Sequence, residues 1–471
     1  MEFLDREEER KRLSRLMDSP EPAFACVYGR RRCGKTRLLL ELLKMRGNST
    51  YCLADRIDRQ LQINAVARTL ARTIPVFKPM SFQNWGDLFE AWLAFAPDGH
   101  ILVLDEFPYL ALKADELTSV LQRIVDEMTF QGRNRKLVIC GSSQRMMQGF
   151  VLQANEPLYG RAREILPIRP LPFACLARAF PKVPPLERLA WWGVMGGVPR
   201  YWELAQHHAS LREMIVEEIA SPLGVLWNEP DFLLMDDVDD SARAASLLSV
   251  IGNGANRVSE IAARLNRKAT DLSHSLKRLL DLGLIVREVP FGTDPLNSKK
   301  SLYRIADNFL AFWYKFILPN RSCVDYLQRT ADWKSFQEPF RIYLGSVWER
   351  LVRELLPSQG VPGVSERWAQ VSRWWGTGTD GKPVELDVVA ESDDGQTLLV
   401  GEAKLTLLKR ERARVLAELE NKAQHLPFRS KYKSLIAHLF VADDFQMSSE
   451  NESFSKQAFS FSNVQSPEAK L

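Results

Sequence analysis

The sequence contains the stretch Gly29-Arg30-Arg31-Arg32-Cys33-Gly34-Lys35-Thr36, which has the spacing G-x-x-x-x-G-K-[ST]. An apolar run, 23–28, precedes this stretch, and a leucine-rich segment, 38–43, follows it. The run is typical of a buried parallel strand and the segment of a helix, so the stretch would be the turn between them. Backbone N–H groups of such a turn point at phosphates, while its lysine reaches the terminal phosphates and its hydroxyl holds Mg²⁺. The stretch therefore predicts a P-loop that binds a nucleoside triphosphate, with Lys35 and Thr36 in those two roles.

A second signal is the apolar run 101–104, which ends in Asp105 and Glu106. After a P-loop this pattern is typical of a Walker B strand, in which Asp105 would hold Mg²⁺ through water and Glu106 would orient the attacking water. Helical segments separate the predicted strands throughout this part of the chain. The alternation predicts an α/β fold whose parallel sheet carries the active site at the carboxyl ends of its strands.

Two more positions allow two interpretations each. Ser142 lies at the polar end of the predicted buried strand 136–143, where a sensor residue would contact the γ-phosphate, but a plain turn stabilised by its hydroxyl is the alternative. Arg161 could supply the positive charge that stabilises phosphoryl transfer, and a surface arginine without that role is the alternative.

Composition limits the class of protein. A chain of 471 residues with 45% hydrophobic and 26% charged residues should form two to four globular domains. Its net charge of +4 is too small to indicate nucleic acid by itself. The charged start resembles no signal peptide, no apolar window is long enough to span a bilayer, and the six cysteines lack paired spacing. We therefore expect a cytoplasmic protein with reduced thiols.

Several motifs, taken in order, resemble those of the archaeal-type ATPases, which are AAA+-related proteins of the STAND group. The resemblance covers about residues 1–230. It implies that Phe3 and Arg6 lie near the base of ATP and that a Gly-Gly-x-Pro turn belongs to a helical lid over the nucleotide. It also implies a slow, nucleotide-gated switch. The motifs are Phe3-x-Asp5-Arg6-x-x-Glu9, the P-loop, Leu104-Asp105-Glu106, Gly141-Ser142, Tyr159-Gly160-Arg161 and Gly196-Gly197-x-Pro199.

The segment 241–305 has the pattern of a winged helix-turn-helix: three helical stretches followed by two short strands, 284–288 and 302–305. We expect Ser259 and Thr270 to cap the second and third helices, and the aspartate-rich segment 231–240 to be a linker. Eight Lys/Arg against four Asp/Glu between 241 and 290 favour DNA contact, while protein contact is the alternative.

The C-terminal part carries a second set of charged residues. Asp387 lies on a predicted strand, 384–389, and Glu402 and Lys404 end the next, 397–404. Alternation along a strand places Glu402 and Lys404 on one face, and Asp387 and Glu402 could jointly hold Mg²⁺ while Lys404 activates water. A half-exposed strand pair with a charged face is the alternative. The pattern, with Glu349 on a preceding helix as a further metal ligand, resembles the PD-(D/E)XK nuclease superfamily.

Together these features predict an α/β chain that binds ATP and Mg²⁺ and hydrolyses ATP. DNA is the expected partner, and a second copy or a partner protein is a further one. Either the C-terminal domain cuts nucleic acid under nucleotide control, or the protein is a nucleotide-gated regulator that binds DNA or protein without cutting. The predicted parts are a P-loop ATPase core (1–170), a helical lid (171–230), a winged helix-turn-helix (241–305), a restriction-endonuclease-like α/β domain (306–444) and a disordered tail (445–471).

Overall fold

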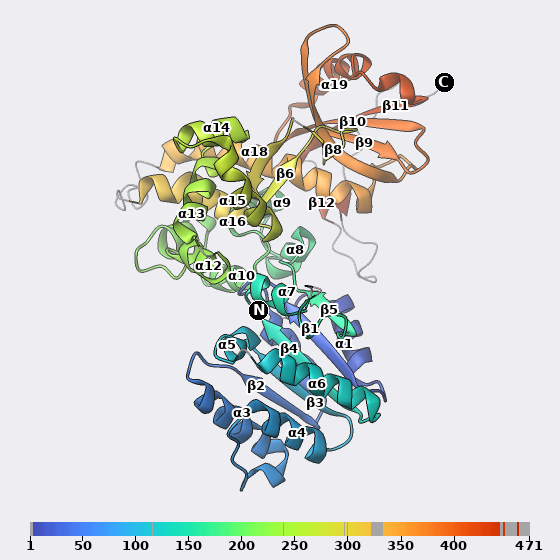
Figure 1. Cartoon of the computed structure of the whole chain (residues 1–471). Coiled ribbons are helices and arrows are strands. Elements are labelled where there is room, and N and C mark those ends of the chain that lie inside the picture. The colour runs from blue at the N-terminus through green and yellow to red at the C-terminus, as the bar shows by residue number, and fades with distance from the viewer. Residues whose placement is uncertain are drawn as a thin grey trace. The chain divides into compact units, whose positions relative to one another are not determined.

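A computed structural model describes residues 3–114, 116–151, 153, 155–238, 240–295, 297–298, 300–321, 333–442, 446–447 and 459–460. The chain forms two compact units (Figure 1). The first consists of Met1–Leu171, Gly197–Glu203 and Phe232–Asp239, and the second of Pro172–Gly196, Leu204–Asp231 and Asp240–Leu471.

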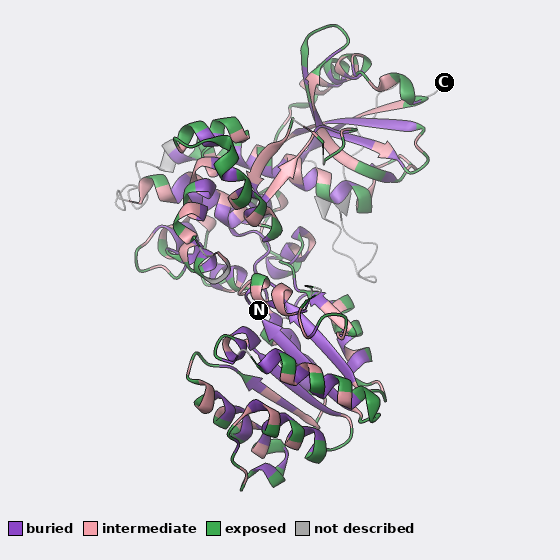
Figure 2. Cartoon of the chain, in the orientation of Figure 1, coloured by how far each residue is buried: buried purple, intermediate pink, exposed green. Residues whose placement is uncertain are grey.

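The first unit is built on a five-stranded sheet in the order β2-β3-β4-β1-β5, and every neighbouring pair is parallel. β1, β3 and β4 are buried along their whole length, as expected for strands covered on both faces (Figure 2). The predicted parallel α/β fold is therefore confirmed. The strands are β1 (Ala23–Tyr28), β2 (Ser49–Leu53), β3 (His100–Asp105), β4 (Arg135–Gly141) and β5 (Glu164–Pro167).

Alternate residues of the central strands enter two separate cores. Phe24 and Cys26 of β1 pack with one set of helices, while Ala25 and Val27 pack with another. This alternation explains why helices cover both faces of the sheet. The helices are α1 (Glu7–Met17), α2 (Lys35–Leu43), α3 (Arg59–Thr73), α4 (Trp85–Phe95), α5 (Phe107–Ala111), α6 (Leu117–Phe130) and α7 (Gln144–Val151), with a 3₁₀ turn at Pro75–Phe77.

The prediction that residues 231–240 form a linker is wrong. Most of it belongs to helix α12 (Glu229–Asp237), because four apolar residues interrupt the aspartates and two of them, Leu233 and Leu234, are buried. Helical structure dominates 172–230, as predicted. Its elements are α8 (Leu176–Ala179), α9 (Pro185–Met195), α10 (Pro199–Ala205), α11 (Leu211–Met214), a 3₁₀ turn at Phe173–Cys175 and a π-helix at Ile215–Ile219.

The segment 241–305 has the predicted order of three helices and a hairpin: α13 (Ser241–Gly252), α14 (Val258–Arg264), α15 (Ala269–Asp281), β6 (Ile285–Glu288) and β7 (Leu302–Ile305). The two strands pair antiparallel. The predicted caps are wrong, since the residues at the cap positions are Arg257 and Lys268. The helices begin earlier than Ser259 and Thr270, so these two side chains lie inside the first turns.

The β6–β7 hairpin packs against the C-terminal sheet. The N–H of Phe291, just after β6, donates to Arg373 O on β8 (Trp368–Thr377) at 2.9 Å, and Ser372 Oγ donates to Val289 O at 3.3 Å. Glu288 pairs with Arg373 (3.1 Å) and with Arg304. Hydrogen bonds and an ion pair therefore hold the β6–β7 hairpin region against β8 of the C-terminal sheet.

The C-terminal sheet has four strands in the order β11-β10-β9-β8. β8, β9 and β10 pair antiparallel, and β11 pairs parallel with β10 because α19 crosses over between them. The sequence prediction missed β8. Further elements are α16 (Asn308–Phe312), a π-helix at Trp313–Ile317, 3₁₀ turns at Leu318–Asn320 and Arg429–Lys431, α18 (Trp333–Gln359), β9 (Pro383–Ser392), β10 (Thr397–Lys404), α19 (Lys409–Gln424) and β11 (Ser434–Val441).

The predicted tail 445–471 lies outside the described residues, except for two paired dipeptides, β12 (Gln446–Met447) and β13 (Phe459–Ser460). Five cysteines fall within the described ranges, and all five are buried. Across these same ranges, none of the helices combines the length and the apolar character that crossing a membrane requires.

Candidate nucleotide site and C-terminal carboxylates

The P-loop connects β1 to α2 through a backbone that needs glycine. Gly29 has φ +149°, and a Cβ there would lie 2.3 Å from Ile168 O. Gly34 has φ +89° and is the N-cap residue of α2, with nothing within 4 Å of where its Cβ would be. The turn therefore leaves open space at the start of a helix, where N–H groups and the helix dipole favour phosphate.

Lys35 and Thr36 lie at this turn as the motif predicts. Lys35 is buried, and its Nζ donates to Gly29 O (2.7 Å) and Arg30 O (3.1 Å). Thr36 Oγ1 donates to Asp105 Oδ2 at 2.7 Å. This hydrogen bond joins the P-loop to the end of β3. A hydroxyl beside a carboxylate supplies the hard oxygen ligands that Mg²⁺ prefers, so these two residues fit that ion.

Asp105 is fully buried and has three hydrogen-bond donors around it. Besides Thr36, Tyr51 Oη donates to Oδ2 at 2.6 Å and the Glu106 N–H donates to Oδ1 at 2.9 Å. Burial and the bond to Asp105 raise the pKa of Tyr51 well above its usual value. Sequence reasoning missed Tyr51. The feature that points to Tyr51 is strand register. β2 pairs with β3 so that Tyr51 lies opposite Val103, and this places Tyr51 on the same face of the sheet as Asp105.

Glu106 is held in a left-handed conformation (φ +54°) directly after β3. Its Oε2 accepts from Ser142 N (3.3 Å) and Ser142 Oγ (2.9 Å). Ser142 therefore contacts the predicted water-orienting carboxylate. Among the described non-glycine residues, Asp5, Arg6, Arg32 and Asn266 also have positive φ. Such conformations are unfavourable and often mark functional sites, and here Arg6, Arg32 and Glu106 lie around one site.

The N-terminal segment lies against the P-loop. The buried Arg6 side chain donates to Cys33 O at 3.2 Å and to Arg169 O, and pairs with Glu9 at 3.1 Å. The ring of Phe3 lies near two arginines, with its centroid 5.8 Å from the guanidinium carbon of Arg37. The structure thus brings Phe3 and Arg6 to the P-loop, and their contact with the base of ATP stays a prediction.

The P-loop arginines contact two tyrosines that the sequence prediction missed. Arg30 donates to Tyr201 Oη at 3.0 Å, and Arg31 donates to Tyr109 Oη at 2.6 Å. Tyr201 follows the Gly-Gly-x-Pro turn, in which Gly197 approaches Leu171 so closely that a Cβ would lie 2.0 Å from Leu171 O. This close approach and the Arg30 contact connect the turn to the P-loop, which is the neighbourhood the family resemblance implied.

Arg161 lies away from this site. It precedes β5, which runs parallel to β1, and the Arg163 N–H bonds Phe24 O near the start of β1. This is the amino-terminal edge of the sheet, whereas the P-loop follows the carboxyl end of β1. The Arg161 guanidinium forms two bonds to Asp126, at 2.7 and 2.9 Å. Arg161 is therefore too far from the P-loop of its own chain to stabilise phosphoryl transfer there. The structure supports the alternative interpretation, a surface arginine in an ion pair.

Asp387 and Glu402 share one face of the C-terminal sheet. Val400 lies opposite Val389 in the antiparallel pair; Glu402 lies two residues after Val400, and Asp387 lies two residues before Val389. Alternation therefore places both carboxylates on the face of these valines. Asp387 Oδ2 accepts from the Ala403 N–H at 2.9 Å, which anchors it beside the end of β10.

Glu349 reaches the same neighbourhood from α18. Burial and the Asp387 carboxylate raise the pKa of Glu349 to about 7, while burial and Glu402 raise the pKa of Asp387. Concentrated carboxylate charge of this kind suits a divalent cation, so the donor set fits Mg²⁺. Arg353, also on α18, lies in the same neighbourhood, because its Nη1 donates to Asp387 O at 2.6 Å.

Lys404 lies beside Glu402, with Nζ 2.7 Å from Oε1, and Lys422 of α19 lies 3.6 Å from the other oxygen. Burial alone would lower the pKa of Lys404, but the hydrogen bond to Glu402 and nearby carboxylates raise it overall. The ammonium form is therefore favoured, which suits stabilisation of negative charge better than proton abstraction. Glu385, also on β9, is exposed and 3.8 Å from Arg373.

Comparison with known proteins agrees with this description of the chain. Residues 3–203 match the model of an ATPase domain found predominantly in archaea, and residues 313–416 match a family of archaeal and bacterial proteins of unknown function. The Walker-type ATPase paby2304 of Pyrococcus abyssi has a similar fold, with a TM-score of 0.50 at 20% identity over 67% of this chain and 96% of that one.

The uncharacterized protein MJECL04 of Methanocaldococcus jannaschii is 33% identical over 408 residues, which are 86% of this chain and 88% of that protein. The match therefore extends well beyond the ATPase domain and includes the region of unknown function. The chain therefore belongs to the family of this Methanocaldococcus protein.

Proposed function

We propose that this ATPase uses ATP as a switch that controls contact with DNA, and that its C-terminal carboxylates form a metal-dependent nuclease site. The observation that carries the ATPase part is the Thr36–Asp105 hydrogen bond, because it joins the P-loop to the Walker B strand. In this proposal Lys35 neutralises the β- and γ-phosphates, Thr36 and Asp105 hold Mg²⁺, and Glu106 orients water. Phe3 and Arg6 support the nucleotide from the N-terminal side.

Replacing Lys35 tests the nucleotide site. Lys35→Ala should weaken ATP binding by about 10- to 100-fold, since a hydrogen bond to a charged group contributes about 1.5–3 kcal/mol. Titration calorimetry with ATP and Mg²⁺ measures the change. Lys44→Ala is a matched control, because Lys44 ends the same helix, is exposed and pairs only locally with Glu41. Equal affinity of the two variants would contradict the role of Lys35.

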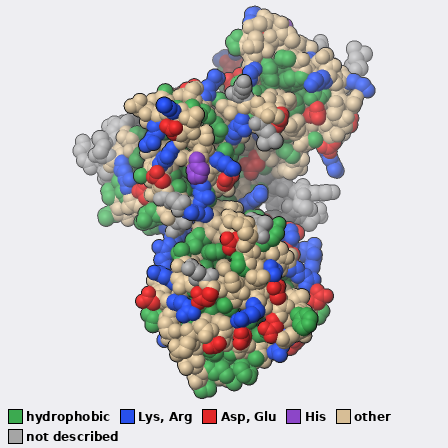
Figure 3. All heavy atoms as spheres, in the orientation of Figure 1, with side chains coloured by type: hydrophobic (Ala, Val, Ile, Leu, Met, Phe, Trp, Pro, Cys, Tyr) green, Lys and Arg blue, Asp and Glu red, His purple; other side chains and the backbone are tan. Residues whose placement is uncertain are grey.

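DNA contact is proposed for the helices of the winged-helix segment. Because the β6–β7 hairpin packs against β8, the surface left for a duplex is formed by α14, α15 and the turn between them. Lys and Arg side chains are visible over this part of the molecule (Figure 3). The exposed basic residues there are Arg264, Arg267, Lys268 and Lys277, and the half-buried Arg278 lies next to Lys277. Such a basic surface suits the phosphate backbone of DNA.

The DNA proposal predicts that duplex affinity of the full chain falls steeply with salt. Replacing both Lys277 and Arg278 with Ala should flatten the slope of log affinity against log salt by up to about 2, since each phosphate contact contributes about 0.9. Fluorescence anisotropy with a labelled duplex measures this slope. The matched control replaces both Arg72 and Lys78 with Ala. It removes the same charge from an exposed part of the first unit and should leave the slope unchanged.

A second candidate function, a nucleotide-gated regulator without nuclease activity, is favoured by one observation. Both oxygens of Glu402 face lysines. Within the described part of the chain, the only three residues whose ligand atoms lie within 4.8 Å of one another are His208, Glu213 and Glu217, which belong to a different region. Glu349, Asp387 and Glu402 would have to move closer together to hold one ion. Cleavage of plasmid in the presence of ATP and Mg²⁺ or Mn²⁺ distinguishes the two functions.

A further inference from the structure

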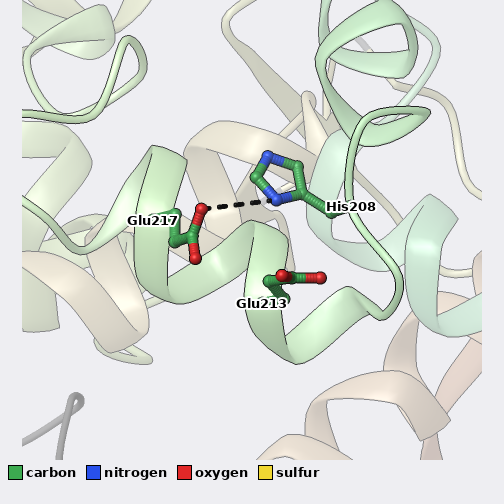
Figure 4. Close-up of side chains that lie close together, drawn as sticks. All are labelled: His208, Glu213 and Glu217. Atoms are coloured by element: carbon green, nitrogen blue, oxygen red, sulfur yellow. Dashed lines mark ion pairs between the residues drawn. The ribbon is translucent and has the colours of Figure 1, made fainter.

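A histidine and three glutamates in the second unit form a cluster that no part of the ATPase or the C-terminal site uses. His208 lies after α10, and its side chain is only 7% exposed. Glu213 belongs to α11, while Glu217 and Glu218 belong to the π-helix that continues it. Figure 4 shows the His208 ring directed at Glu217, with Glu213 one turn earlier. One ligand atom each from His208, Glu213 and Glu217 lie within 4.8 Å of one another.

The two ring nitrogens of His208 have different surroundings. Nε2 lies 3.2 Å from Glu218 Oε1, which is a hydrogen bond. Because a carboxylate only accepts, Nε2 must carry the proton and donate. Nδ1 lies 3.7 Å from Glu217 Oε2, which is too far for a hydrogen bond. In the neutral ring Nδ1 is then an acceptor that faces carboxylates, and a cation between these groups would satisfy all of them.

The spacing suits a metal ion. Nitrogen and oxygen ligands about 2.1 Å from a tetrahedral zinc ion are about 3.4 Å apart. The 3.7 Å between Nδ1 and Glu217 therefore needs a small contraction, and the full set of ligand atoms, which lie within 4.8 Å of one another, would close around the ion. A carboxylate on the far nitrogen of a metal-bound histidine fixes the tautomer and strengthens the ligand, and Glu218 has this position. Glu217 and Glu218 are consecutive residues of the π-helix and lie at opposite nitrogens of the same ring.

We propose that His208, Glu213 and Glu217 bind a divalent transition-metal ion, with zinc or manganese as the ions that one imidazole and two carboxylates suit, and that Glu218 positions His208. The ion ties the segment after α10 to the π-helix. The alternative occupant of the same space is a proton, which would make His208 an imidazolium ion paired with two glutamates.

The test uses full-length protein that has been stripped with chelator, then titrated with Zn²⁺ or Mn²⁺ alone. Wild type should bind one equivalent more than His208→Ala by calorimetry and metal analysis. His207→Ala is the matched control, because His207 is the exposed neighbour and should bind like wild type. The reference protein and both variants all carry Asp387→Ala, so that the C-terminal carboxylates do not add to the count in any of them.

Replacing the buried His208 could disturb folding, so Glu217→Gln is a second test that avoids this problem. The Glu217 side chain is 60% exposed, and its replacement leaves the core intact. It should also lose the extra equivalent, and Glu218→Gln should weaken binding by about 10- to 100-fold. Co²⁺ bound in the wild type should give visible absorption bands that His208→Ala lacks. If His208→Ala and His207→Ala bind the same number of ions with the same affinity, the metal proposal is wrong and the imidazolium takes its place.

Discussion

Glu106→Gln is expected to lower the rate of ATP hydrolysis by about 10²- to 10⁴-fold, because a positioned carboxylate that activates water contributes that much. Affinity for ATP should change little, since Lys35 and the P-loop backbone bind the phosphates. Phosphate release and titration calorimetry measure the two quantities separately. Glu90→Gln, an exposed change of the same kind, should behave like wild type. Hydrolysis by Glu106→Gln at the wild-type rate would remove Glu106 from its assigned role.

The Ser142 contact adds a second test of the same carboxylate. Ser142→Ala removes the hydroxyl bond to Glu106 but keeps the backbone N–H bond. We expect hydrolysis to fall by about 10-fold at unchanged ATP affinity, because one hydrogen bond to a charged group is lost and Glu106 is less well oriented. If Ser142 instead contacts the γ-phosphate directly, as the sensor interpretation holds, ATP affinity should fall as well.

The other large effect is expected at the C-terminal carboxylates. Asp387→Ala should abolish both metal binding and cutting there, because it removes a ligand that the Ala403 N–H holds in place. Lys404→Ala should abolish cutting and leave metal binding largely intact, since its ammonium stabilises charge on the phosphodiester. ATP hydrolysis should survive both changes. Plasmid cleavage, Mn²⁺ titration and phosphate release are the three measurements.

Glu385→Gln is the matched control for Asp387, since the two residues are on the same strand and the Glu385 side chain is 68% exposed. It should keep metal binding and cutting. A wild-type protein that binds no Mn²⁺ at this sheet and cuts no plasmid would eliminate the nuclease proposal. The nucleotide-gated regulator would then be the remaining function, and the ATPase and DNA predictions would stand independently of this result.

Local sequence determined much of the fold. The run 23–28 and its glycine-bounded turn can form only a buried strand and a tight connection, and the apolar run before Asp105 likewise specifies a central strand. These features depend on residues that are neighbours in sequence, so pattern alone predicts them. The same holds for Leu272, Leu276 and Leu279, whose helical spacing predicted the buried face of α15.

Tertiary structure alone decided which distant side chains meet. Tyr51 reaches Asp105 through strand register, Tyr201 reaches Arg30 from 171 residues away, and Ser142 meets Glu106 because β3 and β4 are neighbours. Arg161 looked suitable by motif but lies at the opposite edge, because strand direction sets the end at which a residue emerges. The physical reason is that hydrophobic periodicity fixes the face of an element, whereas the position of that element beside others depends on packing across the whole domain.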